Sequence, residues 1–282
     1  MTQNERKLIP EERWEKATLA DNFIFYKVMR HHPDACKHLL EMLLNVKISR
    51  MEMHSEETID LDHDKKGIRL DIFVKEENRM YDIELQVVDT RELQKRARYY
   101  AGLMALDTLR DGEPYKNLRD SHVIFICMED IFNYGHPVYS FQNICAEDPQ
   151  VKLNDGDFKH FFIAPLCARM IEDEELKTFF EFLISNQAGS DFTSTLRGYV
   201  EDARHNMQWR FQFMTYLRQR YYDLEAGRQE GLETGRKEGR SQKAIEAAEN
   251  LLKMGLGTAE QIAQAEGLPL EKVMELKEKL QA

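Results

Sequence analysis

Four residues that could do chemistry lie on the polar faces of two neighbouring segments that alternate between apolar and polar residues. In the run GIRLDIFV, every second residue from Ile68 is apolar, so Asp71 falls on the opposite face. In the run MYDIELQV, the same alternation puts Asp82, Glu84 and Gln86 on one face. The pattern predicts two strands whose carboxylates point away from the apolar side chains.

A two-residue loop at Glu77 and Asn78 would join these segments as a β-hairpin. That register puts Asp71 directly opposite Glu84, with their β-carbons about 5 Å apart. Like charges at this distance destabilise a sheet unless a cation neutralises them, and carboxylate oxygens suit Mg²⁺. The sequence therefore favours a divalent metal site, with ordinary charges on a solvated sheet face as the alternative interpretation.

The elements before the hairpin show first helical and then strand periodicity. Residues 21–45 have apolar side chains at helical spacing that Pro33 interrupts, which predicts two short consecutive helices. The period then switches toward two in three runs, ISRMEMHSEETIDL, GIRLDIFVKEE and RMYDIELQVV. We expect these runs to form three antiparallel strands.

After the hairpin the spacing becomes helical again over residues 91–109, and Tyr99, Leu103 and Leu106 are expected on one side of that helix. The apolar run SHVIFICM is typical of a fully buried strand. In residues 137–192, FKHFFIAP is expected to add a strand and EELKTFFEFLIS a helix, both for packing. The fold class predicted is therefore α/β.

The start of the helix after the hairpin is basic, although the chain as a whole is acidic. The net charge of −11 argues against a surface coated with basic residues for nucleic-acid binding, so any contact with DNA must be local. The run RELQKRAR offers Lys95, Arg96 and Arg98 as residues that could meet a DNA backbone. An ordinary charged helix surface is the alternative interpretation.

The C-terminal series EAGRQEGLETGRKEGR, followed by AAENLLKMGL, resembles the tail of a known family, and several earlier stretches carry the same resemblance. They are DNFIFYKVM, CKHLLEMLL, GIRLDIFV, YDIELQ, KRARYYAGLMALD, SHVIFICMEDIF and NDGDF. Together they resemble the recombination-promoting nuclease (Rpn) family of transposase-related proteins, within the PD-(D/E)XK nuclease superfamily. The resemblance implies a restriction-endonuclease-like core: a helix, a three-stranded antiparallel meander, a helix and a strand. It also implies an all-helical C-terminal extension.

The resemblance further implies metal-dependent hydrolysis of DNA phosphodiester bonds. Asp71 and Glu84 would bind Mg²⁺ or Mn²⁺, and Gln86 would stand where the wider superfamily has a lysine. A neutral amide can orient a water molecule but cannot supply positive charge. The expected function is therefore a DNA endonuclease, with a weak or inactive DNA- or protein-binding regulator on a nuclease fold as the alternative.

The C-terminal region divides from the nuclease-like domain by composition. We expect a nuclease-like domain over residues 1–200, a helical connector with repeated glycines over 201–240 and a small helical module over 241–282. The connector could be a continuous helix or a hinge, and it is a candidate surface for homo-oligomers. The module has helix-turn-helix spacing, but its second helix balances acidic and basic residues, so a packing hairpin is an equal alternative.

Composition bounds the remaining possibilities. Apolar residues make up 42% and charged residues 32% of the 282 residues, which is typical of a globular protein. No apolar run is long enough to span a membrane, and the N-terminal residues lack the apolar core of a signal peptide. We therefore expect a cytoplasmic protein with no membrane partner, whose widely spaced cysteines are reduced thiols.

Overall fold

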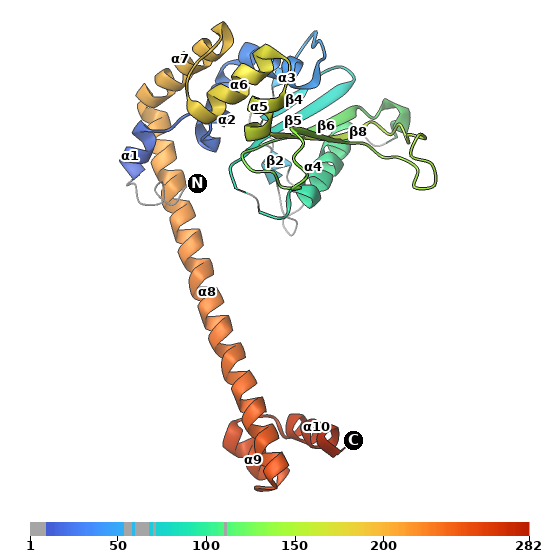
Figure 1. The fold of residues 1–282 in the computed structure, drawn as a ribbon, viewed down its shortest axis with the longest axis vertical. Helices are drawn as coiled ribbons and strands as arrows, with labels where there is room; N and C mark the ends of the chain where they lie inside the picture. Colours follow the sequence, from blue (N-terminus) through green and yellow to red (C-terminus); the bar gives the residue numbers. More distant parts are fainter. Residues whose placement is uncertain are drawn as a thin grey trace. The chain divides into compact units, whose positions relative to one another are not determined.

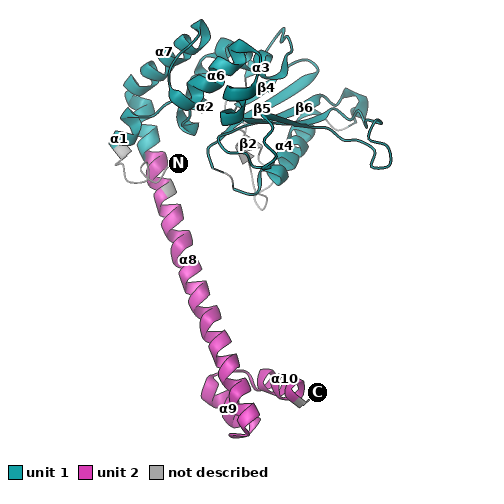
Figure 2. Ribbon diagram, viewed as in Figure 1, with its two compact units in different colours: residues 1–214 teal, residues 215–282 magenta. Residues whose placement is uncertain are grey.

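The computed structural model describes residues 10–53, 58–59, 68–69, 72–88, 90–109 and 112–281. The chain forms two compact units, Met1–Met214 and Thr215–Ala282 (Figure 2). The elements of the first unit, in chain order, are α1 (Pro10–Glu15), α2 (Asn22–His31), α3 (Pro33–Leu44), β1 (Glu52–Met53), β2 (Thr58–Ile59), β3 (Ile68–Arg69), β4 (Ile72–Lys75), β5 (Arg79–Gln86), α4 (Leu93–Thr108), the 3-10 helix η2 (Tyr115–Asn117), β6 (Asp120–Cys127), β7 (Val138–Phe141), β8 (Asp157–Ile163), α5 (Ala164–Met170), α6 (Glu174–Ser185) and α7 (Asp191–His205). The chain then continues through α8 (Met207–Met254), which crosses the boundary, into α9 (Ala259–Glu266) and α10 (Leu270–Gln281).

A six-stranded sheet with the order β1-β4-β5-β6-β8-β7 forms the centre of the first unit. Strands β1, β4 and β5 pair antiparallel, whereas β6 is parallel to β5 and to β8. Strands β2 and β3 form a separate two-stranded sheet. The first strand expected from the sequence thus corresponds to the two short strands β1 and β2, and the second corresponds to β3 and β4. Strand β5 has a neighbour on both sides and is a central strand of the sheet.

Helices cover the two faces of this sheet (Figure 1). Helix α4 packs its buried side chains against one face, where the core includes Phe73, Met80, Val123 and Phe125. Helix α2 contacts β4 and β5, and Phe162 of β8 stacks on Phe180 of α6. Because successive residues of a strand point to opposite faces, the alternation in the hairpin sequence separates two buried faces rather than one buried face and one solvated face.

The sequence predicted the helix after the hairpin, but the side that carries the three expected apolar residues is not the side that packs on the core. Tyr99 and Leu106 are exposed, and Leu103 alone of the three expected residues is buried. The residues of α4 that contact the core are Leu93, Ala97, Tyr100, Ala101, Leu103 and Met104. The centre of the buried side therefore lies about one residue, or about 100°, around the helix from the centre of the side that carries Tyr99, Leu103 and Leu106.

The pair of N-terminal helices forms as the sequence predicts. Asp21 caps α2, because its carboxylate accepts a hydrogen bond from the backbone N–H of Phe23 at 3.0 Å. Helix α3 begins at Pro33, whose missing N–H is not needed in the first turn of a helix. Asp21 therefore has a structural role at the start of this helix.

In the second unit, the glycine-containing segment belongs to one continuous helix. Helix α8 contains Gly227, Gly231, Gly235 and Gly239, and a β-carbon added at any of them would meet no atom within 4 Å. A capping box at Thr258 starts α9. The small core of this unit is formed by Ala248, Ile262, Ala263, Val273 and Leu276. Across the residues described, none of the helices is both long enough and apolar enough to cross a membrane.

Candidate active site

The β4–β5 hairpin has the register that its sequence predicts. Ile72 pairs with Ile83 and Val74 with Tyr81, so the paired residue numbers share one sum and the turn lies at Glu77 and Asn78. Asp71 lies outside the described residues. Its place opposite Glu84 therefore stays a prediction from the sequence.

Glu84 and Asp82 are buried on the face of β5 that α4 covers. Glu84 is 2% exposed and Asp82 is fully buried, whereas Gln86 at the end of the strand is partly exposed. The interpretation as an ordinary charge on a solvated sheet face is therefore wrong for Glu84, whereas Asp71, the other acid that it concerned, lies outside the described residues. A buried carboxylate is costly unless it is paired or bound to a cation, so a partner for Glu84 is needed.

Arg96 of α4 is that partner. Its guanidinium Nη2 forms an ion pair with Oε2 of Glu84, and its Nη1 donates a hydrogen bond to Oε1 of Gln86 at 3.0 Å. The side-chain amide of Gln86 donates in turn to the carbonyl oxygen of Val88 at 2.5 Å. The amide oxygen and the Glu84 carboxylate therefore share one cationic group.

Tyr100, one turn after Arg96 on α4, completes this group. Its hydroxyl accepts hydrogen bonds from Arg96 Nη2 at 2.9 Å and Nε at 3.3 Å, and it also hydrogen-bonds to Glu84. Burial raises the pKa of Tyr100, and the negative charge of Glu84 raises it further. Its ring stacks on Phe125, and the Arg96 guanidinium lies over both rings. Tyr100 is therefore a neutral hydroxyl that holds its neighbours in place.

The oxygens of this cluster are the kind that bind hard cations. Glu84, Gln86 and Tyr100 each direct an oxygen at one positively charged guanidinium, which shows that the position stabilises positive charge. Carboxylate and amide oxygens are ligands of Mg²⁺ and Mn²⁺. Within the described ranges, no group of three or more His, Cys, Asp or Glu residues is placed to hold a metal ion. The donor chemistry fits a divalent cation, and a further carboxylate such as Asp71 would be needed to complete the ligands.

The three basic residues selected from the sequence differ in their surroundings. Lys95 and Arg98 are exposed on α4, whereas the Arg96 side chain is 31% exposed and turned toward the sheet. The sequence did not indicate Tyr100, and it placed Asp82 on the face of Glu84 without assigning it a role in the site. The signal for Tyr100 was its spacing of four residues from Arg96, and the signal for Asp82 was its place on the same strand face as Glu84.

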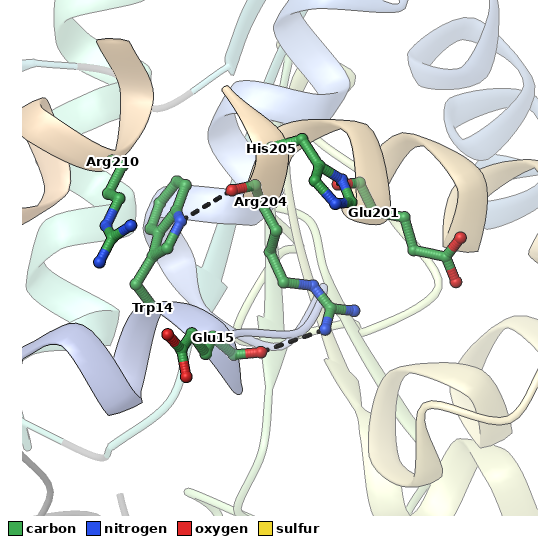
Figure 3. Close-up of a pocket in the computed structure, with 6 residues that line it drawn as sticks. All are labelled: Trp14, Glu15, Glu201, Arg204, His205 and Arg210. Atoms are coloured by element: carbon green, nitrogen blue, oxygen red, sulfur yellow. Dashed lines mark hydrogen bonds between the residues drawn. The ribbon is translucent and has the colours of Figure 1, made fainter. Parts of the chain in front are cut away.

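A hollow of about 300 Å³ lies elsewhere in the first unit, lined by residues of α1, α7 and α8 (Figure 3). The indole N–H of Trp14 donates to the carbonyl oxygen of Arg204 at 2.9 Å, and Nη1 of Arg204 donates to the carbonyl oxygen of Glu15 at 3.2 Å. Its lining contains none of the residues selected from the sequence. These contacts tie α1 to α7, and the hollow is separate from the cluster on β5 and α4.

The architecture and the cluster together define a class of protein. A mixed α/β domain, in which a buried glutamate and a glutamine two residues later lie on a central strand beside a helix, is consistent with a PD-(D/E)XK nuclease-like domain. Residues 31–162 match the family model described as PD-(D/E)XK nuclease family transposase, so this part of the chain is similar to that family. The match contains the hairpin, α4 and β6, and it confirms the resemblance found in the sequence. No curated protein and no solved structure matches the chain.

Proposed function

We propose that this protein is a metal-dependent DNA endonuclease that hydrolyses phosphodiester bonds. The observation that carries the proposal is the buried Glu84, held beside Gln86 on a central strand of a domain that matches a nuclease family. Ordinary structural carboxylates are placed at the surface, and a buried acid among oxygen ligands is typical of a functional site. DNA is the substrate that the family description implies.

In this proposal Glu84 and Asp71 hold Mg²⁺ or Mn²⁺. When bound, the metal polarises a phosphoryl oxygen and lowers the pKa of the attacking water. Gln86 positions that water with its side-chain amide, because an amide both donates and accepts hydrogen bonds. The exposed Lys95 and Arg98 contact the phosphates of the DNA backbone, and their charges offset the acidic character of the rest of the chain.

A second function is a DNA- or protein-binding regulator that does not cleave. The ion pair between Arg96 and Glu84 favours it, because the guanidinium neutralises the carboxylate that a metal would use. The net charge of −11 also suits a basic protein partner. This alternative predicts binding without turnover under every metal condition.

Plasmid cleavage distinguishes the two functions. Supercoiled plasmid is incubated with the full chain and Mg²⁺, Mn²⁺ or a chelator, and the relaxed and linear forms are separated on a gel. The endonuclease predicts metal-dependent relaxation that Asp71→Ala and Glu84→Ala each abolish, while circular dichroism shows that both variants remain folded. Glu172→Gln, which removes an exposed carboxylate before α6, is the matched control and should cleave normally. Cleavage that survives Glu84→Ala would show that the site is wrongly assigned.

A further inference from the structure

One arginine of α4 is separated from its basic neighbours by the geometry of the helix. Arg96 lies three residues after Leu93 and four before Tyr100, and both of these side chains are buried against the sheet. Lys95 and Arg98 lie on other sides of the helix and are exposed. A single basic run thus supplies two kinds of residue, one turned inward and two facing solvent.

The inward arginine bonds to two residues of the proposed site at once. Its planar guanidinium donates through Nη2 to Glu84 and through Nη1 to Gln86, which are two residues apart on one face of β5. An arginine can make this forked contact because its donors have a rigid planar arrangement, whereas a lysine presents a single point charge. The spacing of the fork therefore sets how far apart the two oxygens lie.

Further contacts hold the guanidinium itself in place. The Tyr100 hydroxyl accepts from Nε and Nη2, and the rings of Tyr100 and Phe125 lie within 5.4 and 5.6 Å of the guanidinium carbon. Cation–π contacts of this kind favour one orientation of the arginine. Arg96 is consequently a rigid group supported by the hydrophobic core of the sheet.

We propose that Arg96 is a positioning residue of the candidate nuclease site, rather than a contact to the DNA backbone. It holds the Glu84 carboxylate and the Gln86 amide in one arrangement, and it supplies the positive charge that Gln86 lacks at the position where the superfamily has a lysine. This assignment rests on the proposed endonuclease function and extends it to α4. Lys95 and Arg98 remain the DNA contacts of the helix.

A double-mutant cycle tests the ion pair without any need for activity. The four proteins are the unaltered chain, Arg96→Gln, Glu84→Gln and the double variant, and the measured quantity is the Tm of the first unit. Arg96→Gln leaves the buried Glu84 without its cation, so Tm should fall by roughly 5 °C or more. Adding Glu84→Gln should restore part of that loss, because a neutral amide needs no counter-charge. Losses that simply add would overturn the proposal.

Kinetics and DNA binding then test the role. Arg96→Gln should lower kcat by about 10- to 100-fold, as removal of a group that orients a metal ligand does. The Kd for DNA should change less than about twofold, because Arg96 is not a phosphate contact in this assignment. Arg96→Lys, which keeps the charge but not the fork, should recover part of kcat. Lys95→Gln and Arg98→Gln should instead raise the Kd for DNA.

The outcomes separate this proposal from the proposed function. If Arg96→Gln weakens DNA binding with kcat intact, Arg96 is a backbone contact and the positioning role is refuted. If the unaltered chain cleaves no DNA with either metal, the endonuclease assignment fails, while the Tm cycle and the DNA Kd still decide whether Arg96 pairs with Glu84 or with DNA. The control is Arg197→Gln, which removes an exposed arginine of α7, a helix that packs against α2 and α6. This variant should behave like the unaltered chain.

Discussion

Replacing Tyr100 by phenylalanine removes one oxygen from the buried cluster and keeps the ring. The hydroxyl accepts hydrogen bonds from Arg96 Nη2 at 2.9 Å and Nε at 3.3 Å, and it also hydrogen-bonds to Glu84. The ring packs against Phe125 with 6.3 Å between the ring centroids, and a phenylalanine ring can occupy the same space. The substitution therefore isolates the contribution of the hydroxyl from that of packing.

The loss of stability expected from Tyr100→Phe follows from the charge and burial of the two side chains that bond to the Tyr100 hydroxyl. A hydrogen bond to a charged group contributes about 1.5–3 kcal/mol to stability. The Arg96 side chain is 31% exposed, so water replaces part of what it loses, whereas the nearly buried Glu84 has little access to water. We therefore expect the free energy of unfolding to fall by about 1–2 kcal/mol.

Tryptophan fluorescence can follow this loss in the correct unit. The chain has 2 tryptophans, and both Trp14 and Trp209 belong to the first unit, so a denaturant titration followed by their emission reports that unit alone. The matched control is Tyr115→Phe, because Tyr115 is 89% exposed and a surface change of this kind alters stability by less than about 0.5 kcal/mol. If Tyr100→Phe loses no more stability than Tyr115→Phe, the hydrogen-bonded cluster does not contribute as described.

Two further predictions concern other parts of the chain. Burial lowers the pKa of His122 to about 3 and that of His160 to about 4, so both are neutral in the folded protein and bind protons more readily when it unfolds. Their contribution to stability is present above pH 6.5 and is lost as the pH falls from there toward 3, and a Tm profile should be flatter for His122→Phe than for the unaltered chain. In α8, Gly231→Ala combined with Gly235→Ala should raise helix stability by about 1 kcal/mol per site, measured by circular dichroism melting, because an added β-carbon meets open space. A lower melting temperature that accompanies a smaller mass in light scattering would instead indicate that the glycines pack against a second copy.

The hairpin could be predicted from the sequence because its information is local. A two-residue turn fixes the register, and the alternation of apolar residues fixes which side chains share a face, so the pairing of Ile72 with Ile83 followed from the sequence alone. What covers each face depends on residues far along the chain. The sequence therefore identified Glu84 and Gln86 as residues of one face, but left open that α4 covers that face.

The role of Arg96 shows the same limit on one helix. Composition grouped it with Lys95 and Arg98 as a basic run, although it lies three residues before Tyr99 and seven before Leu103, on the expected apolar side of the helix. Helix α4 has little contrast between its sides, because small residues such as Ala97 and Ala101 contact the core as closely as large ones do. Periodicity alone therefore did not show which of the basic residues of this helix meets Glu84.

The central place of β5 in the sheet also has a consequence for its motions. Its backbone pairs with β4 on one side and β6 on the other, so its amide hydrogens should exchange with solvent only when most of the first unit opens. Helix α4 is attached to the sheet through its side chains only, so we expect it to open while the sheet persists. Hydrogen exchange should then show the amide of Glu84 in the slowest class and the amides of the later turns of α4 in a faster one. Local opening of α4 would then separate Arg96 from Glu84 while β5 keeps its pairing in the sheet.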